Sequence, residues 1–449
     1  MITLILGMIV AAVLGAILYT IIGVAPGTDE TAVLAPVTLA LVLSGLPVPI
    51  ILAFFISAIV AKKLTDSIPV AVAGIPGGVM AAPMVEHAMV LKAHGMPDVS
   101  IRKMASGSVI GTLVAVPLSL ILGNLLIPLG PVVSKYAGQI FFFGAVFLAL
   151  MSRAKIVSLI SIVPFALLIQ GLRHLYWGVG AIPENKVVFI SFFLGITIGP
   201  MIVNIIELLV PGRRDELKRT SFKEVAIRKD VREKRLPNPF SILDRGEIVA
   251  ASLASIIGTI TFFMSPVGMT IFLGEGVAAR LKDPVKRASR AISSMDALTN
   301  ATYISGTLIP LIALGTPISP MAIGPANALF NAPPRFTLEN NIHHMISRGD
   351  FVLPVLIGAV IALAITYPIA IRYSAQICKF VFKRISHEAL MGIFFGLVMM
   401  LAFMDAGVIN IGGVLLVALV GGFLNRWGVN YGVQFMTLYA AGWLTGVLA

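Results

Sequence analysis

The chain has 449 residues, of which 58% are apolar and 12% are charged. The charged share is about half that of an average soluble domain, so the composition excludes an ordinary soluble protein. It favours helices in contact with lipid, each of which needs about 20 consecutive apolar residues. The formal net charge is +12. Basic residues collect in the cytoplasmic loops of membrane proteins, and no nucleic-acid motif is visible, so we expect membrane lipid and no nucleic acid as a partner.

Apolar segments follow one another along almost the whole chain. They cover residues 1–24, 33–61, 68–91, 104–127, 132–150, 155–177, 186–210, 246–264, 300–331, 350–372, 388–405, 408–424 and 429–448. The first segment has neither a basic n-region nor a small-residue cleavage site, so we expect it to remain as the first helix. Several segments contain Gly and Pro. The pattern therefore predicts an all-α polytopic membrane protein with about ten to twelve spanning helices plus broken or re-entrant segments.

One stretch is plainly polar. Residues 213–245 contain eleven basic and six acidic side chains. The positive-inside rule places this stretch in the cytoplasm, and a solvated linker is its simplest interpretation. It divides the chain into an N-terminal transmembrane half (1–210), a basic cytoplasmic linker (211–245) and a C-terminal transmembrane half (246–449).

A second basic run lies between Arg280 and Arg290. A single crossing between the two basic stretches would place them on opposite faces of the membrane. A broken helical hairpin that turns at residues 265–268 would keep both in the cytoplasm, and we predict that arrangement.

The two halves share a pattern of interruptions. Pro26-Gly27 is followed fifty residues later by Pro76 in a Gly-x-Pro break, and Pro266 is followed after fifty-one residues by Pro317 in another. This predicts a duplicated architecture in which residues 1–127 and 246–372 are inverted repeats. Paired Gly/Pro interruptions in two halves mark the substrate site of many transporters.

A broken helix frees backbone N–H groups that attract anions. We therefore predict that the breaks bind an organic anion through the backbone and the hydroxyls of Thr316 and Ser319. Kinking and close packing of helices are the competing interpretation, which the matched spacing disfavours. The predicted substrate-binding residues are Pro26, Gly27, Thr28, Thr31, Gly74, Pro76, Gly77, Gly78, Asn300, Gly315, Thr316, Pro317 and Ser319.

Charged residues near apolar segments are costly and tend to be functional. The candidates for coupling transport to an ion are Asp29, Glu30, Asp66 and Asp296. Lys62 lies four residues before Asp66, so on a helix the two share a face and can pair. Otherwise Lys62 and Lys63 are interpreted as snorkelling side chains. The spacings Gly107/Gly111, Gly195/Gly199, Gly392/Gly396 and Gly442/Gly446 predict close helix packing.

Motifs of hydrolytic enzymes are absent from the sequence. It contains no G-x-x-x-x-G-K-[ST] loop, no H-E-x-x-H and no G-x-S-x-G. His343-His344 lacks the spacing of metal ligands. We therefore expect neither an enzyme nor a bound cofactor, apart from a coupling Na⁺ or H⁺.

The chain resembles the large membrane subunit of the tripartite tricarboxylate transporters. GVAPGT (residues 23–28) and GIPGGVMAAPMVEHAMVLKAHG (74–95) look like that family's first Pro-Gly loop and first break. GVAARLKDPVKRASRAISSMDALTNAT (276–302) and GTLIPLIALGTPISP (306–320) are similar to its basic turn and second hallmark. The resemblance implies a secondary permease, a symporter of the cell inner membrane, driven by a proton or sodium gradient. It also implies a carboxylate substrate such as citrate, a small membrane subunit and a periplasmic solute-binding protein as partners.

Two features depart from the family pattern. Asp29 and Glu30 stand in the first loop, where a coupling cation would account for them, and a Gly-rich tract is replaced by Lys62-Lys63-Leu64-Thr65-Asp66. Taken with the paired breaks and the family resemblance, the sequence favours a transporter that moves a small organic anion by alternating access. A flippase for a lipid-linked anion and a non-transporting membrane scaffold remain alternatives. A channel is disfavoured because no repeated filter motif is visible.

Overall fold

The computed structural model of the protein is mostly helical over the part of the chain that it describes. That part comprises residues 2–25, 28, 30–73, 78–81, 83–152, 154–184, 188–209, 238–264, 266–373, 376, 380 and 387–448. Two isolated β-bridges join Ala332 to Phe336 and Thr337 to Asn340, and these residues form no strand. The expected all-α fold is confirmed, and the basic linker lies mostly outside the described residues.

The helices follow the predicted apolar segments closely. The first part of the chain forms α1 (Ile2–Val24), α2 (Glu30–Leu43), α3 (Val48–Ala73), η1 (Val79–Ala81), α4 (Met84–Ala93), α5 (Pro97–Leu125), η2 (Ile127–Leu129), α6 (Gly130–Lys135), α7 (Ala137–Met151), α8 (Lys155–Gly178) and α9 (Ile190–Leu209). The second part forms α11 (Pro239–Ile242), α12 (Arg245–Ile260), α13 (Pro266–Ala278), α14 (Pro284–Ala313), α15 (Pro320–Ile323), α16 (Asn327–Phe330), α17 (Ile342–Met345), η3 (Arg348–Phe351), α18 (Val352–Arg372), α20 (His387–Arg426) and α21 (Tyr431–Leu448).

Six of the described helices are long and apolar enough to cross a membrane unaided, and the bent pair η2–α6 with α7 makes up to seven if it forms one span rather than a re-entrant loop. The expected ten to twelve crossings therefore require helices that are shorter or more polar. α14 is one such helix, because its 30 residues include Lys286, Arg287, Arg290 and Asp296. The protein is multi-pass, and the number of crossings stays a prediction.

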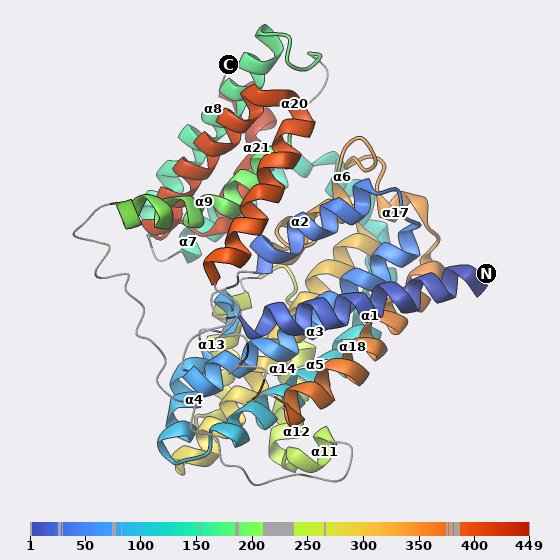
Figure 1. Ribbon diagram of the computed structural model, residues 1–449, viewed down its shortest axis with the longest axis vertical. Helices are drawn as coiled ribbons and strands as arrows, with labels where there is room; N and C mark the ends of the chain where they lie inside the picture. Colours follow the sequence, from blue (N-terminus) through green and yellow to red (C-terminus); the bar gives the residue numbers. More distant parts are fainter. Residues whose placement is uncertain are drawn as a thin grey trace.

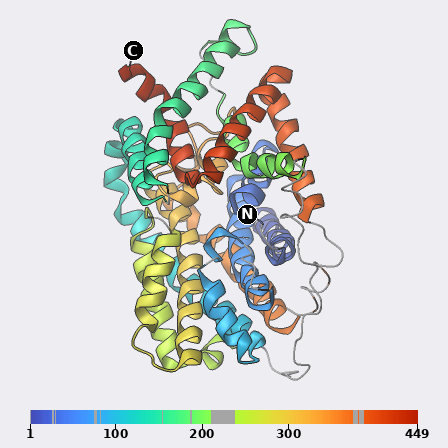
Figure 2. The ribbon, with the colours of Figure 1, turned by 90° about the vertical axis from the view of Figure 1, so that its left-hand side faces the viewer.

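The helices form two bodies, which Figures 1 and 2 show one above the other. The lower body contains α1, α3, α5, α12, α14 and α18, and the upper body contains α7, α8, α9, α20 and α21. α2 packs on α3 in the lower body and on α9 and α20 in the upper one. Each body takes helices from both sides of the basic linker, because α5 packs on α14 and α9 packs on α20.

The lower body is built from two units of three helices each. α1, α3 and α18 pack on one another and run in the same direction, as do α12, α14 and α5. The pairs that set the direction of the first unit are Gly7 with Ile50, Gly23 with Lys62, and Thr20 with Thr366. Those of the second unit are Gly107 with Ser293, Gly123 with Ile312, and Ser289 with Glu247. In each unit, the third helix (α18 in the first and α5 in the second) comes from the other half of the chain.

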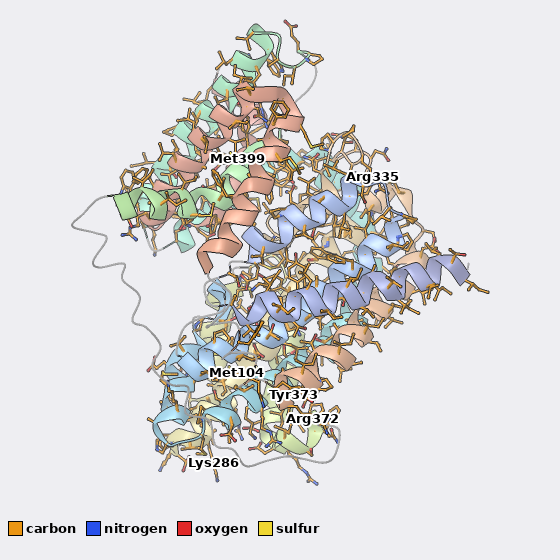
Figure 3. All side chains as sticks on the ribbon, viewed as in Figure 1. Met104, Lys286, Arg335, Arg372, Tyr373 and Met399 are labelled. Carbon is orange, nitrogen blue, oxygen red and sulfur yellow. The ribbon has the colours of Figure 1, made fainter. Side chains whose placement is uncertain are left out.

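The two units run in opposite directions. The hydroxyl of Ser106, near the start of α5, lies 2.9 Å from that of Tyr367, near the end of α18. Figure 3 places Met104, Lys286 and Arg372 towards the same lower end of the molecule. Exchanging α1, α3 and α18 for α12, α14 and α5 preserves the packing partners and reverses the direction, as inverted repeats require. Superposition of residues 1–127 on 246–372 stays a prediction.

A local sequence pattern accompanies this relation. The sequence Ile-Pro-x-x-x-x-Gly-x-Pro begins in the last turns of both α3 and α14, at residues 68–76 and 309–317. Each helix runs through the first proline and ends before the glycine, and a short helical turn follows, η1 in one case and α15 in the other. Proline is tolerated inside these helices because neighbouring helices cover the backbone groups that it frees.

The predicted hairpin between the two basic stretches is present. α12 begins at a capping box in which Asp244 and Glu247 exchange side-chain and backbone hydrogen bonds. α14 starts beside it, because Arg290 Nη2 lies 3.9 Å from Asp244 Oδ1. The turn between α12 and α13 comes before Pro266, the first residue of α13, whereas the sequence predicted it at residues 265–268. Proline favours a helix start because its missing N–H is not needed there.

Candidate substrate and ion site

α3 contains a cluster of buried charges in the middle of the lower body. Lys62, Lys63 and Asp66 expose 1% of their surface or less. Lys62 Nζ lies 2.8 Å from Asp66 Oδ1, and Lys63 Nζ lies 2.9 Å from Asp66 Oδ2. The predicted pairing of Lys62 with Asp66 is confirmed. The interpretation of both lysines as snorkelling side chains is wrong, because the surrounding helices cover them completely.

Glu30 connects the start of α2 to this cluster. Its carboxylate accepts a hydrogen bond from Lys63 Nζ at 2.6 Å, and only 2% of the residue is exposed. As the first residue of α2, Glu30 also lies where the helix dipole favours negative charge. A Cβ atom at Gly78 would overlap the carboxylate of Glu30. Glu30 therefore lies between Lys63 and the backbone that follows the first break.

α14 contributes the opposite wall of the cluster. The Nζ atom of Lys63 lies 4.7 Å from the ring centroid of Tyr303, a cation–π distance. Asp296 is 1% exposed and interacts electrostatically with Lys63 and Asp66. With Glu30 and Lys62, the cluster contains two amines and three carboxylates. With all five side chains ionised, these described residues carry a formal net charge of −1.

Asn300 follows Asp296 by one turn and faces α5. Its Nδ2 atom lies 3.0 Å from the carbonyl oxygen of Ser108, 2.9 Å from Ser108 Oγ and 2.8 Å from Thr112 Oγ1. The amide thus joins α14 to α5. Asn300 was predicted to bind substrate, and in this structure its amide nitrogen is engaged within the helix bundle.

The second break is a helix end held by a loop. α14 stops at Ala313, and Gly315 has φ = +64°, which glycine adopts without strain. Its carbonyl accepts a hydrogen bond of 2.7 Å from Asn341 Nδ2, and His343 Nδ1 lies 2.9 Å from the carbonyl oxygen of Ile312. Burial, helped by the adjacent His343, lowers the pKa of His344, so its Nδ1 remains an acceptor for the Asn341 N–H at 3.2 Å. The predicted interruption after α14 is confirmed.

The hydroxyls expected at this break are partly engaged. Ser319 is the N-cap of α15, accepting from the N–H of Ala322 at 3.0 Å and donating to the carbonyl of Gly306. Thr316 is 4% exposed, and its Oγ1 lies 3.3 Å from the carbonyl oxygen of Leu314. Their predicted contact with a substrate carboxylate stays a prediction, as does that of Pro317.

The first turn of α2 contacts described residues that follow each of the two predicted breaks. Glu30 lies against Gly78, which follows the first break, and Thr31 lies against Gly324, which follows the second. A Cβ atom at Gly324 would lie 2.9 Å from Thr31 Oγ1. Thr28, just before this turn, caps α1 by donating to the carbonyl of Ala25 at 2.9 Å. Glu30 and Thr31 thus lie against Gly78 and Gly324, and their predicted roles in binding substrate or a coupling ion stay predictions.

A cavity of about 540 Å³ lies beside the end of α14. Its walls include Ile312, His343 and Phe351. This volume lies in the range of small-molecule sites. The cavity adjoins the end of α14 but not the charged cluster.

The comparison with known families decides the identity of the chain. Residues 9–433 match the tripartite tricarboxylate transporter TctA family. The chain belongs to the TctA family. No curated protein and no solved structure matches it.

Membership of the TctA family makes the protein a membrane component of a tricarboxylate transport system, and not a member of an enzyme family. TctA proteins work with other subunits in a tripartite system. Six predicted site residues lie outside the described part of this TctA chain: Pro26, Gly27, Asp29, Gly74, Pro76 and Gly77. Their roles stay predictions.

Two sets of residues escaped the sequence interpretation of this TctA chain. Lys63 and Tyr303 complete the charged cluster, and the signal for them was two lysines within an otherwise apolar helix. The second set surrounds a break in α20 at Ala406-Gly407, where the Ser191 hydroxyl donates to Asp405 Oδ2 at 2.5 Å. A carboxylate inside an apolar span was the available signal there.

Proposed function

We propose that this protein is the permease of a secondary active transporter, which moves a small organic anion of the di- or tricarboxylate class across the cell inner membrane by alternating access. The observation that carries the proposal is the buried charged cluster around Lys63, which includes Glu30 of the first turn of α2. The same turn contacts Gly78 and Gly324, which follow the two predicted breaks. A buried lysine that already holds two carboxylates offers the charge that a carboxylate substrate requires.

Glu30 gives the site a specific mode of action. Its carboxylate lies 2.6 Å from Lys63 Nζ, and the residue belongs to the first turn of α2. A substrate carboxylate would replace Glu30 at Lys63, and the displaced Glu30 would free α2 from α3. Because α2 also packs on α9 and α20, its movement would alter the contact between the two bodies.

The energy source and the partners belong to the same proposal. We expect a proton or sodium gradient to drive uptake, with a small membrane subunit and a periplasmic solute-binding protein delivering the substrate. The two antiparallel units support alternating access, because inverted repeats can exchange conformations across the membrane.

The test is counterflow of labelled citrate and succinate in proteoliposomes, for wild type, Lys63→Gln and Lys286→Gln. A hydrogen bond to a charged group contributes roughly 1.5–3 kcal/mol. Lys63→Gln should therefore weaken apparent substrate affinity by about ten- to a hundredfold. Lys286 is an exposed lysine on α14, so its variant should behave as wild type.

Thermal unfolding should show that each variant is folded before transport is compared. Equal counterflow by wild type and a folded Lys63→Gln variant would refute this site. Movement of a lipid-linked anion by the reconstituted protein, without carboxylate counterflow, would favour the flippase instead.

A further inference from the structure

One face of α14 carries a stripe of buried polar side chains. Asp296, Asn300, Tyr303 and Thr307 follow one another at helical spacing and are at most 2% exposed. Three of their oxygen atoms, Asp296 Oδ2, Asn300 Oδ1 and Thr307 Oγ1, make no hydrogen bond with any described residue. Buried acceptors without a donor are rare in folded proteins, so these atoms require an explanation.

The orientation of the Asn300 amide is fixed by its neighbours. The carbonyl oxygen of Ser108 can only accept a hydrogen bond, so the group that faces it at 3.0 Å must be the NH₂ end of the amide. The contact of Nδ2 with Thr112 Oγ1 at 2.8 Å agrees with this orientation. Asn300 Oδ1 is therefore an oxygen acceptor, one turn from the carboxylate of Asp296.

Asp296 differs from the other carboxylates of the cluster. Glu30 is paired with Lys63 at 2.6 Å, and Asp66 is paired with both lysines. No hydrogen bond or ion pair reaches Asp296 Oδ2 from the described part of the chain, although the residue is only 1% exposed. A carboxylate that stays ionised at such a depth needs a compensating positive charge.

We propose that Asp296 Oδ2 and Asn300 Oδ1 bind a sodium ion. One cation satisfies both acceptors and offsets the formal net charge of −1 carried by the two amines and three ionised carboxylates. A single carboxylate suits a monovalent ion, and the described residues contain no group of three His, Cys, Asp or Glu side chains that could hold a divalent metal. The role of this sodium ion in driving transport rests on the proposed function, whereas its binding at Asp296 and Asn300 does not.

The experiment measures binding of ²²Na⁺ to the purified full-length protein in lipid nanodiscs, without substrate or partner subunits, in choline buffer. Wild type should bind Na⁺ at one saturable site. Asp296→Asn preserves the shape of the side chain and should weaken binding by at least about tenfold, as should Asn300→Ala. Thermal unfolding reports whether Asn300→Ala, which loses its link to α5, is folded. Asp296→Asn alone decides the matter if it is not.

Two controls locate the ion. Glu275→Gln removes a carboxylate that is 40% exposed, and Asn410→Ala removes another buried amide with an unpaired Oδ1 at the break of α20. Both should bind Na⁺ as wild type does. The proposal is overturned if wild type binds no Na⁺, if Asp296→Asn binds it unchanged, or if only Asn410→Ala loses it. Absence of citrate counterflow together with Na⁺ binding at Asp296 would refute the proposed function and leave this site standing.

Discussion

Lysines buried inside an apolar helix need partners from the same helix and from other elements. Asp66 was predictable as a partner of Lys62, because four residues on a helix always share a face. Glu30 was not predictable as a partner of Lys63, since 33 residues separate them and the contact requires α2 to fold back onto α3. Removing one member of such a buried pair costs about 3–5 kcal/mol, because the other charge is left without compensation.

Gly78 provides a test of this cluster at a single atom. Alanine at this position would place its Cβ within the carboxylate of Glu30 and push that group away from Lys63. We expect Gly78→Ala to lower the free energy of unfolding by about 1–3 kcal/mol, the usual cost of overpacking. Thermal unfolding in detergent measures the change. Gly276→Ala, where nothing lies within 4 Å of the new Cβ, is the matched control and should be close to neutral. Equal destabilisation of both variants would show that the Glu30 contact is not responsible.

Glycines decide which helices approach closely. Gly107 and Gly111 of α5 lie against the carbonyls of Ser293 and Ala297 in α14, and the pair at positions 195 and 199 lies against α20. Both pairs confirm the close packing predicted from their spacing. No described residue lies within 4 Å of a Cβ added at Gly392, Gly396, Gly442 or Gly446, so close packing at these pairs stays a prediction.

Local sequence signals therefore revealed helices, breaks and candidate packing faces, but not the partner of each face. The partner is set by tertiary arrangement. α5 packs against α14, which belongs to the other half of the chain, and no feature of residues 97–125 alone specifies α14 as its partner. The buried role of Asn300 followed from this pairing and was missed for the same reason.

The α5–α14 interface should be sensitive to one methyl group. Gly111→Ala would force its Cβ into the carbonyl oxygen of Ala297, a backbone atom that cannot rotate away. We expect a loss of about 1–3 kcal/mol in the free energy of unfolding, with a matching fall in the unfolding temperature. Gly171→Ala lies in α8 with open space around it and should be neutral or slightly stabilising, because alanine favours helix. A stable Gly111→Ala variant would contradict the contact.

The distribution of charge over the whole molecule sets its orientation in the membrane. Basic side chains gather at the end of the lower body that holds the start of α14 and the end of α18. They include Arg102, Lys103, Arg245, Lys286, Arg287, Arg290 and Arg372, of which Figure 3 labels Lys286 and Arg372. At the opposite ends of these helices, the described loops contain Lys135, Arg335 and Arg348. By the positive-inside rule, we expect the first end to face the cytoplasm, together with the basic linker 211–245.

Labelling of single cysteines tests the orientation and the antiparallel arrangement together. In a background with Cys378→Ser, cysteines replacing Lys286 and Tyr373 should react with a membrane-impermeant maleimide only after the cells are opened. Cysteines replacing Lys135 and Ser347 should react in intact cells. All four side chains are exposed, so burial does not limit the reaction. The reverse pattern would invert the orientation but keep the fold. Reaction of Lys286→Cys and Ser347→Cys from the same side would contradict the fold itself, because α14, which lies between those positions, could then not cross the membrane.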